Sequence, residues 1–203
     1  MLTKLNKPKK LSSRSGAFIG AEASSDLRIA VRFSQAFKVL YNSDKYQDEI
    51  VMPALFLVRQ FLELGLKYNI RQLAPHSKSQ NLINKLSKMH DLTKLYVSFS
   101  EHYKFAKRSL ELTELEDDTY LADLKSLVDE INKFDNKSTG YRYSTDKDGT
   151  LQIDENATFN LSPIGALLDN VVNFLAHIED ILYCPYLSRQ LSPFSSLIQK
   201  KPH

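Results

Sequence analysis

Cysteine is almost absent from this sequence, which has only Cys184 among its 203 residues. A lone cysteine excludes an intrachain disulfide and a cysteine metal cage, and beside Pro185 it is best explained as a small apolar filler. Glycine and proline are also scarce, with six and seven residues. Because all-β sandwiches and barrels need a turn about every ten residues, this scarcity disfavours those folds.

Long apolar runs and a dominant charge are missing as well. No run approaches the length needed to cross a bilayer, and the N-terminus lacks the apolar stretch of a signal peptide. We therefore expect a cytoplasmic protein. The 27 basic and 24 acidic residues leave a formal net charge of +3, too small to indicate nucleic-acid binding from bulk electrostatics. The positive excess lies near the ends, where it favours solvated, loosely ordered termini over a nucleic-acid arm.

The remaining composition is that of an ordinary globular domain, with 42% hydrophobic and 25% charged residues. The length fits a single core. We predict a flexible basic segment at residues 1–21, a helical domain at 22–184 and a loosely attached tail at 185–203.

Apolar residues at helical spacing predict five helices. They lie at about residues 26–41, 49–72, 92–103, 119–133 and 162–182, with a short helix possible at 82–86. Alternating aromatic and polar residues at 141–145, a turn at Asp148-Gly149 and the run 151–153 predict a β-hairpin. The expected fold class is mainly α: a five-helix bundle with a small β-hairpin inserted before the last helix.

The second helix is the expected centre of the fold. From residue 54 to 70 it is apolar around most of its circumference, which is typical of a helix surrounded by neighbours. The charged side chains in that run are Arg59, Glu63 and Lys67, which share one stripe. Two interpretations stay open: a solvent-facing strip of weak ion pairs, or an interior polar seam in which Glu63 holds Arg59 toward a cleft. Pro53 is expected in the first turn, where its missing N–H has no intrahelical partner.

Asp91 is the expected N-cap of the third helix. His90 before it either has no special role or faces the Arg59/Glu63 seam, where a carboxylate would orient its ring for general acid/base chemistry near neutral pH. Arg142 lies between Tyr141 and Tyr143. That trio is either ordinary strand surface or a guanidinium-and-ring platform for the phosphates and bases of single-stranded RNA.

Other motifs are weak or missing. Arg71 and His76 are separated by four residues, a spacing that also arises by chance. The sequence contains no Gly-rich phosphate loop, no His-Glu-x-x-His and no Gly-x-Ser-x-Gly elbow. The other histidines have no spacing that suggests metal, so neither a metal nor another cofactor is expected.

Three separated elements carry a family resemblance. They are the apolar run with the Arg-x-x-x-Glu-x-x-x-Lys stripe, the His90-Asp91-Leu92-x-x-Leu95 helix start, and Tyr141-Arg142-Tyr143 ahead of a Lys-Asp-Gly turn. In this order they resemble uncharacterised bacterial HEPN-like helical bundles, over roughly residues 25–182.

The resemblance implies a homodimer from an antiviral defence or toxin–antitoxin system. Many HEPN proteins are metal-independent endoribonucleases with an Arg-x(4–6)-His motif, whose His acts on the ribose 2′-OH or leaving oxygen while the Arg neutralises charge at phosphorus. Arg71 and His76 fit that spacing, although they lie at the end of the second helix and enclose Pro75, whereas the family motif usually opens a late helix.

The resulting hypothesis is a HEPN-like protein that binds RNA and could cleave it without metal. The residues implied for catalysis are His90, Arg59, Glu63, Arg71 and His76, and those for substrate binding are Arg142, Tyr141, Tyr143 and Lys67. One alternative is a non-catalytic interaction module, such as an accessory subunit partnering a nucleotidyltransferase or a larger defence complex encoded nearby. The other is a small-molecule or nucleotide sensor that binds phosphate through Arg59 and Arg142.

Overall fold

A computed structural model describes residues 25–112, 118–133, 148–149 and 158–183. Within these ranges the chain is mainly helical and contains no strand. The elements are α1 (Asp26–Tyr41), α2 (Gln47–Leu73), the short 3₁₀ helices η2 (Ala74–His76) and η3 (Ile83–Lys88), α3 (Leu92–Ser109), α4 (Asp118–Asn132) and α5 (Ser162–Tyr183). The predicted bundle of five α-helices is therefore confirmed. The predicted hairpin lies outside the described residues, apart from the turn at 148–149.

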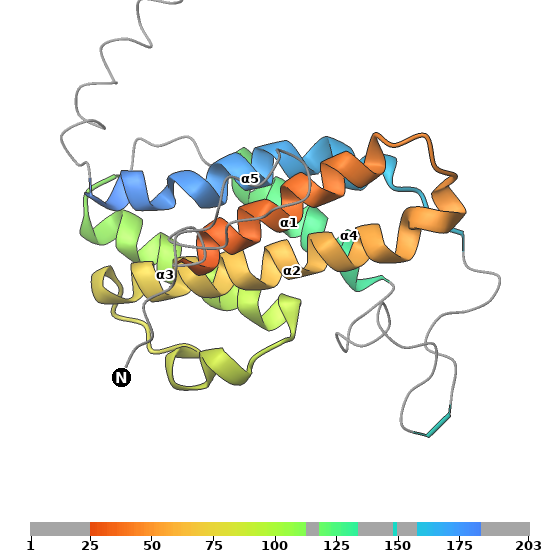
Figure 1. Cartoon of the computed structure of the whole chain (residues 1–203). Coiled ribbons are helices and arrows are strands. Elements are labelled where there is room, and N and C mark those ends of the chain that lie inside the picture. Colours follow the sequence, from red (N-terminus) through yellow and green to blue (C-terminus); the bar gives the residue numbers. More distant parts are fainter. Residues whose placement is uncertain (1–24, 113–117, 134–147, 150–157, 184–203) are drawn as a thin grey trace, which may run out of the picture.

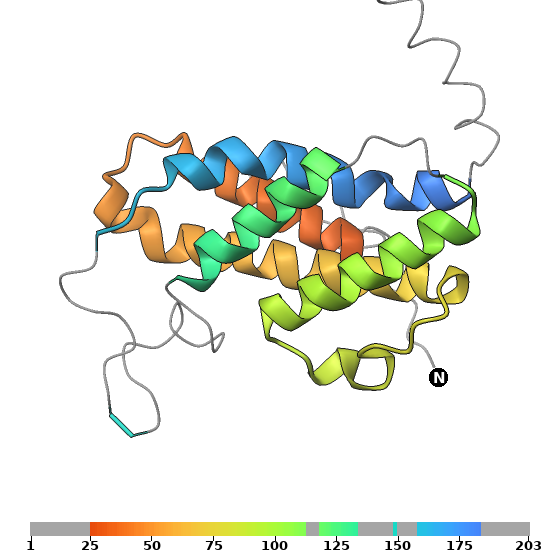
Figure 2. The same ribbon diagram turned by 180° about the vertical axis from the view of Figure 1, so that it is seen from behind.

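Helix α2 runs through the middle of the bundle and packs against the other four α-helices (Figure 1). Helix α1 lies along one side of α2, and α5 lies beside α1. Seen from behind, α3 and α4 cover the side of α2 that faces away from α1 (Figure 2). This arrangement explains why α2 has no broad polar face.

The burial of α2 confirms its predicted central position. Leu55, Phe61, Leu62, Leu66 and Ile70 are completely buried although they point in different directions around the helix. Each such side chain contributes about 1.5–3 kcal/mol through removal of apolar surface from water. Since neighbours cover α2 on nearly every side, its helical conformation depends on packing more than on intrinsic propensity.

The start of α2 differs from the prediction. The helix begins at Gln47, so Pro53 lies inside it, in the second turn. Asp48 and Glu49 occupy the first turn, where negative charge interacts favourably with the helix dipole and supports the earlier start. Pro53 cannot donate a hydrogen bond to the carbonyl of Glu49, so the prediction that its missing N–H has no intrahelical partner was wrong.

A buried asparagine joins α2 to α5. The Nδ2 group of Asn69 donates to the carbonyl oxygens of Gly65, one turn earlier, and of Leu175 on α5, each at 3.0 Å. The backbone of α2 at Gly65 lies close to α5, because a Cβ atom at Gly65 would stand 3.2 Å from Cδ1 of Leu175. The hydroxyl of Tyr68 donates to the carboxylate of Glu179 at 2.7 Å. These bonds set the position of α5 along the axis of α2.

Replacing Phe61 with Ala tests whether α2 is the core of the bundle. Phe61 is completely buried, so we expect the free energy of unfolding to fall by about 3–5 kcal/mol in urea denaturation. The matched control is Phe105→Ala, at a side chain that is 38% exposed on α3, for which a clearly smaller loss is expected. Equal losses for the two variants would contradict the central position of α2.

Candidate functional site

The charged stripe of α2 lies inside the protein. Arg59, Glu63 and Lys67 are only 1%, 7% and 5% exposed. The interpretation as a solvent-facing strip was therefore wrong. The stripe lies in the interior, as the second interpretation expected, but Glu63 bonds Lys67 and His90 and does not hold Arg59. The covering segment is the connection between α2 and α3, residues 74–91, which folds back against α2.

The carboxylate of Glu63 is the centre of this seam. Its Oε1 atom accepts hydrogen bonds from Nζ of Lys67 and from Nδ1 of His90, each at 2.8 Å. The side chain of His90 is 57% exposed, whereas those of Glu63 and Lys67 are under 10% exposed. A buried carboxylate thus holds a histidine ring whose other edge faces solvent.

The tautomer of His90 follows from this contact. A carboxylate oxygen accepts hydrogen bonds, so Nδ1 carries the proton when the ring is neutral, and Nε2 is then the acceptor. Among the described residues, the ring of His90 forms one hydrogen bond, which joins Nδ1 to Glu63. Nε2 is accordingly available to take a proton from a ligand.

Arg59 fixes the backbone at the same position. Its Nη2 atom donates to the carbonyl oxygen of His90 at 2.8 Å. The next residue, Asp91, caps α3 as predicted, because its Oδ1 accepts from the backbone N–H of Lys94 at 3.0 Å. His90 is therefore held through its ring, its carbonyl group and the helix start that follows it.

The connection is attached to α3 by a second polar cluster. The carboxylate of Glu101 accepts from the hydroxyl of Ser79 at 2.7 Å and from Nδ2 of Asn81 at 2.8 Å. The carbonyl oxygen of Asn81 accepts from Ser98 at 2.9 Å and from Nε2 of the fully buried His102 at 3.1 Å. The hydrogen bonds from Ser79 and Asn81 lower the pKa of Glu101 from its ordinary value of 4.5.

Sequence reasoning missed this second cluster. A signal was present, because Ser98, Glu101 and His102 share one face of α3 and the loop 77–81 is rich in serine and asparagine. The short helix predicted at 82–86 is found as η3, which begins one residue later.

Leu82, the residue before η3, adopts a left-handed backbone conformation, with φ of 61°. This conformation is costly for a branched side chain, so the flanking contacts must hold it.

Neither Arg71 nor His76 is hydrogen-bonded to the carboxylate of Glu63. Nη1 of Arg71 bonds Oδ2 of Asp26 at 2.5 Å and ties the end of α2 to the start of α1. His76 lies in η2, partly exposed, and is not hydrogen-bonded to Arg71. The structure thus gives Arg71 a contact that links two helices.

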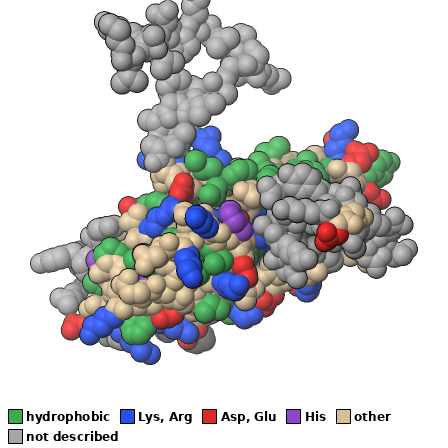
Figure 3. All heavy atoms as spheres, turned by 90° about the horizontal axis from the view of Figure 1, so that it is seen from below, with side chains coloured by type: hydrophobic (Ala, Val, Ile, Leu, Met, Phe, Trp, Pro, Cys, Tyr) green, Lys and Arg blue, Asp and Glu red, His purple; other side chains and the backbone are tan. Residues whose placement is uncertain are grey.

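The predicted binding residues Tyr141, Arg142 and Tyr143 lie outside the described residues. On the face seen from below, several basic side chains lie on the described surface (Figure 3). Among the described residues there is no group of three or more His, Cys, Asp or Glu side chains that could hold a metal ion. No helix in the same ranges is long and apolar enough to cross a membrane.

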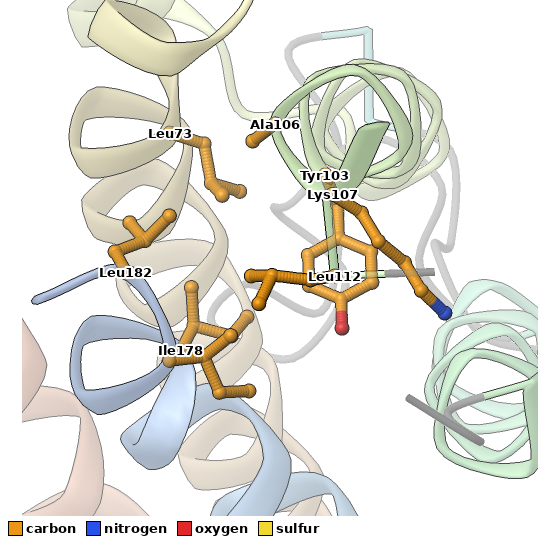
Figure 4. Close-up of a pocket in the computed structure, with 8 residues that line it drawn as sticks. Leu73, Tyr103, Ala106, Lys107, Leu112, Ile178 and Leu182 are labelled. Atoms are coloured by element: carbon orange, nitrogen blue, oxygen red, sulfur yellow. The ribbon is translucent and has the colours of Figure 1, made fainter. Parts of the chain in front are cut away.

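A small apolar cavity lies where α2, α3 and α5 meet (Figure 4). Its volume is about 10 Å³, and Leu73, Tyr103, Ile178 and Leu182 are among its lining residues. A space of this size holds about one water molecule, and an apolar lining gives that water few partners. The cavity is a packing gap and offers no room for a ligand.

No protein-family model, no curated protein and no solved structure matches this chain.

Replacing Glu63 with Gln tests the charge pairing in the seam. The change removes the negative charge beside the buried ammonium group of Lys67. We expect a loss of about 3–5 kcal/mol in the free energy of unfolding. In the control, Asp129→Asn, the lost pair with Lys125 is exposed, and little or no loss is expected. If Glu63→Gln is as harmless as the control, the seam is not a buried ion pair.

Acid should weaken the attachment of the connection to α3. The pKa of Glu101 is lower in the folded state than its ordinary value. The stability that comes from its ionised form is therefore complete above the unfolded-state pKa and is lost as the pH falls through the folded-state pKa. The measurement is urea denaturation of wild type and Glu101→Gln between about pH 7 and pH 3. The stability difference should be constant above about pH 5.5 and shrink below about pH 4.5. A constant difference at every pH would contradict this attachment.

Proposed function

We propose that this chain is a HEPN-like protein that binds RNA and cleaves it without a metal ion, with His90 as the general base. The observation that carries the proposal is the contact between Nδ1 of His90 and the buried carboxylate of Glu63, which leaves Nε2 at the surface. A histidine oriented in this way by a carboxylate is a common general base near neutral pH. The order of the sequence elements that resemble HEPN proteins is the second support.

The proposed reaction uses the ribose 2′-OH of the substrate as nucleophile. Nε2 of His90 takes the 2′-OH proton, and the 2′-oxygen forms a bond to the adjacent phosphorus. The bond from phosphorus to the 5′-oxygen breaks, and that oxygen takes a proton from water. The hydroxide that remains takes the proton held by His90, which regenerates water and the neutral ring. The products are a 2′,3′-cyclic phosphate and a 5′-hydroxyl. Glu63 stabilises the positive imidazolium ring that forms during the first step.

In this proposal the buried cations act on the site and not directly on the substrate. Arg59 holds the carbonyl group of His90 and so positions the ring. Lys67 pairs with Glu63 and offsets the free-energy cost of burying its carboxylate. Contacts to RNA phosphates and bases are assigned to Arg142, Tyr141 and Tyr143, and the homodimer and the defence or toxin–antitoxin setting are further parts of the same proposal.

The test is cleavage of 5′-labelled single-stranded RNA and of tRNA in the presence of EDTA. Wild type should produce fragments that end in a 2′,3′-cyclic phosphate, and RNA with a 2′-deoxy nucleotide at the cleavage site should resist. His90→Ala should lower the rate by about 10²–10⁴-fold, which is the usual contribution of a general base. His177→Ala is the control, because that histidine is also exposed but lies on α5 and bonds only the backbone of its own helix.

The variant His76→Ala shows which of the two predicted catalytic histidines, His76 or His90, is required for cleavage. His76 is not hydrogen-bonded to Glu63 or Arg71, so we expect cleavage by His76→Ala to stay near the wild-type rate. Loss of activity in His76→Ala, with activity retained in His90→Ala, would assign the reaction to the Arg71/His76 motif. If wild type neither binds nor cleaves RNA at micromolar concentration, the RNA function is refuted.

A further inference from the structure

The connection between α2 and α3 carries positive charge on its exposed side. The sequence has no aspartate or glutamate between Glu63 and Asp91, whereas Lys85 and Lys88 lie in this interval and are exposed. The two carboxylates that bound the interval are already engaged, because Glu63 bonds His90 and Asp91 caps α3. The exposed charges of residues 74–90 are therefore all positive.

The short helix η3 in this connection has one buried and one polar side. Leu86 is 3% exposed and belongs to the hydrophobic core, whereas Asn84, Lys85, Ser87 and Lys88 are exposed. Lysine, asparagine and serine are side chains through which proteins contact the phosphates and sugars of nucleic acids. Leu86 thus anchors η3 to the bundle and leaves groups at the surface that suit a sugar-phosphate backbone.

The two lysines of η3 share one edge of the helix. A 3₁₀ helix has three residues per turn, so Lys85 and Lys88 are aligned along its axis, about 6 Å apart. Within the described ranges neither lysine side chain takes part in an ion pair or a hydrogen bond. Two neighbouring ammonium groups on one edge can contact two phosphates of a single strand.

Lys88 brings this edge close to His90. The residue between them, Met89, has an extended backbone, with φ of −85° and ψ of 127°. An extended residue favours a common direction for the side chains on either side of it, and Lys88 and His90 are both exposed. Their Cα atoms are at most about 7 Å apart, the length of two extended residues. A strand that contacts Nε2 of His90 is therefore within reach of Lys88.

We propose that Lys85 and Lys88 bind backbone phosphates of the RNA strand on one side of the scissile phosphate at His90. This inference rests on the proposed function for the position of the scissile phosphate. A lysine ammonium group is a point charge, so these contacts supply affinity and register without base preference. On the other side of His90, Lys94 pairs with Asp91 at 3.3 Å, which offsets part of its charge. The strand is thus held mainly on the η3 side.

The composition of η3 favours a nucleic-acid strand over an anionic membrane surface. A segment that lies on a membrane places apolar side chains among the lipids beside its lysines. In η3, Leu86 is buried and Ile83 is half-buried, and the exposed neighbours of the lysines are Asn84 and Ser87. An amide and a hydroxyl group can bond phosphate and sugar oxygens, which matches the chemistry of RNA.

The test measures binding separately from cleavage. The probe is a fluorescein-labelled single-stranded 2′-O-methyl RNA of about 12 nucleotides. It has no free 2′-OH, so the proposed reaction cannot cleave it. Binding to the full chain is followed by fluorescence anisotropy between about 50 and 200 mM salt. Wild type should bind with an affinity that falls as salt is added, because phosphate contacts release counterions.

Three double variants locate the contacts. Lys85→Gln/Lys88→Gln should weaken binding by about tenfold or more at the lowest salt and lower the slope of log affinity against log salt by about 1.4, since each phosphate contact of a single strand contributes about 0.7. Lys85→Arg/Lys88→Arg keeps the charge and should bind as wild type does. Lys104→Gln/Arg108→Gln is the matched control, because these exposed basic residues lie about 18 and 24 Å beyond the start of α3. It should also bind as wild type does. Circular dichroism melting checks that each variant is folded.

The proposal is overturned if wild type does not bind the probe, or if Lys85→Gln/Lys88→Gln binds it as tightly as the α3 control does. It is also overturned if this variant loses binding to phosphatidylserine vesicles and keeps binding to the probe, because η3 is then a membrane surface.

The same variants distinguish this proposal from the cleavage reaction. If wild type binds the probe through the two lysines and leaves unmodified RNA intact, the phosphate contacts stand and the reaction proposed for His90 fails. If wild type cleaves RNA, Lys85→Gln/Lys88→Gln should raise KM with little change in kcat, whereas His90→Ala should lower kcat. Cleavage with an unchanged KM in Lys85→Gln/Lys88→Gln would leave the reaction in place and contradict the lysine contacts.

Discussion

The pairing of the Glu63 carboxylate with Lys67 and His90 is the interaction on which the candidate site depends. A buried carboxylate is costly unless charged or polar groups are bonded to it. Here one oxygen accepts from an ammonium group of the same helix and from a histidine 27 positions later in the chain. The second contact can form only if the connection between α2 and α3 returns to α2. Fold and site are therefore linked through this single side chain.

That connection is held at both of its ends. Near its start, Ser79 and Asn81 bond Glu101, while Ser98 and His102 bond the backbone of Asn81. At its end, Arg59 and Glu63 bond His90. Between the two lies Leu82, with a backbone conformation that is unfavourable outside glycine. Polar contacts at both ends give an irregular segment a defined position, which the role proposed for His90 requires.

The sequence predicted the helices well because their apolar residues recur at helical spacing over many turns. It could not decide where the Arg59/Glu63/Lys67 stripe faces, since a spacing of four residues looks the same on a surface and in a core. The answer comes from the connection, whose polar residues give no periodic signal. Glu101 and His102 were missed for the same reason, because their partners lie about 20 positions away in a loop.

Spacing along the chain was also a poor guide to Arg71 and His76. Their separation fits a family motif, but Arg71 pairs with Asp26 at the start of α1, and Arg71 and His76 share no hydrogen bond.

The start of α2 was also predicted inaccurately. Acidic residues in the first turn extend α2 toward its N-terminus and leave Pro53 inside the helix. For His90, one of the two interpretations from the sequence placed it beside Arg59 and Glu63, and the structure shows both contacts.

The proposed role of His90 depends on which nitrogen of its neutral imidazole ring carries the proton, and nitrogen NMR measures this directly. With ¹⁵N-labelled histidine and His90→Gln for assignment, the two ring nitrogens can be distinguished at a pH where the ring is neutral. The account predicts a proton on Nδ1, bonded to Glu63, and an unprotonated Nε2. A neutral ring with its proton on Nε2 would show that Glu63 does not orient His90, and would contradict the assignment of His90 as a general base.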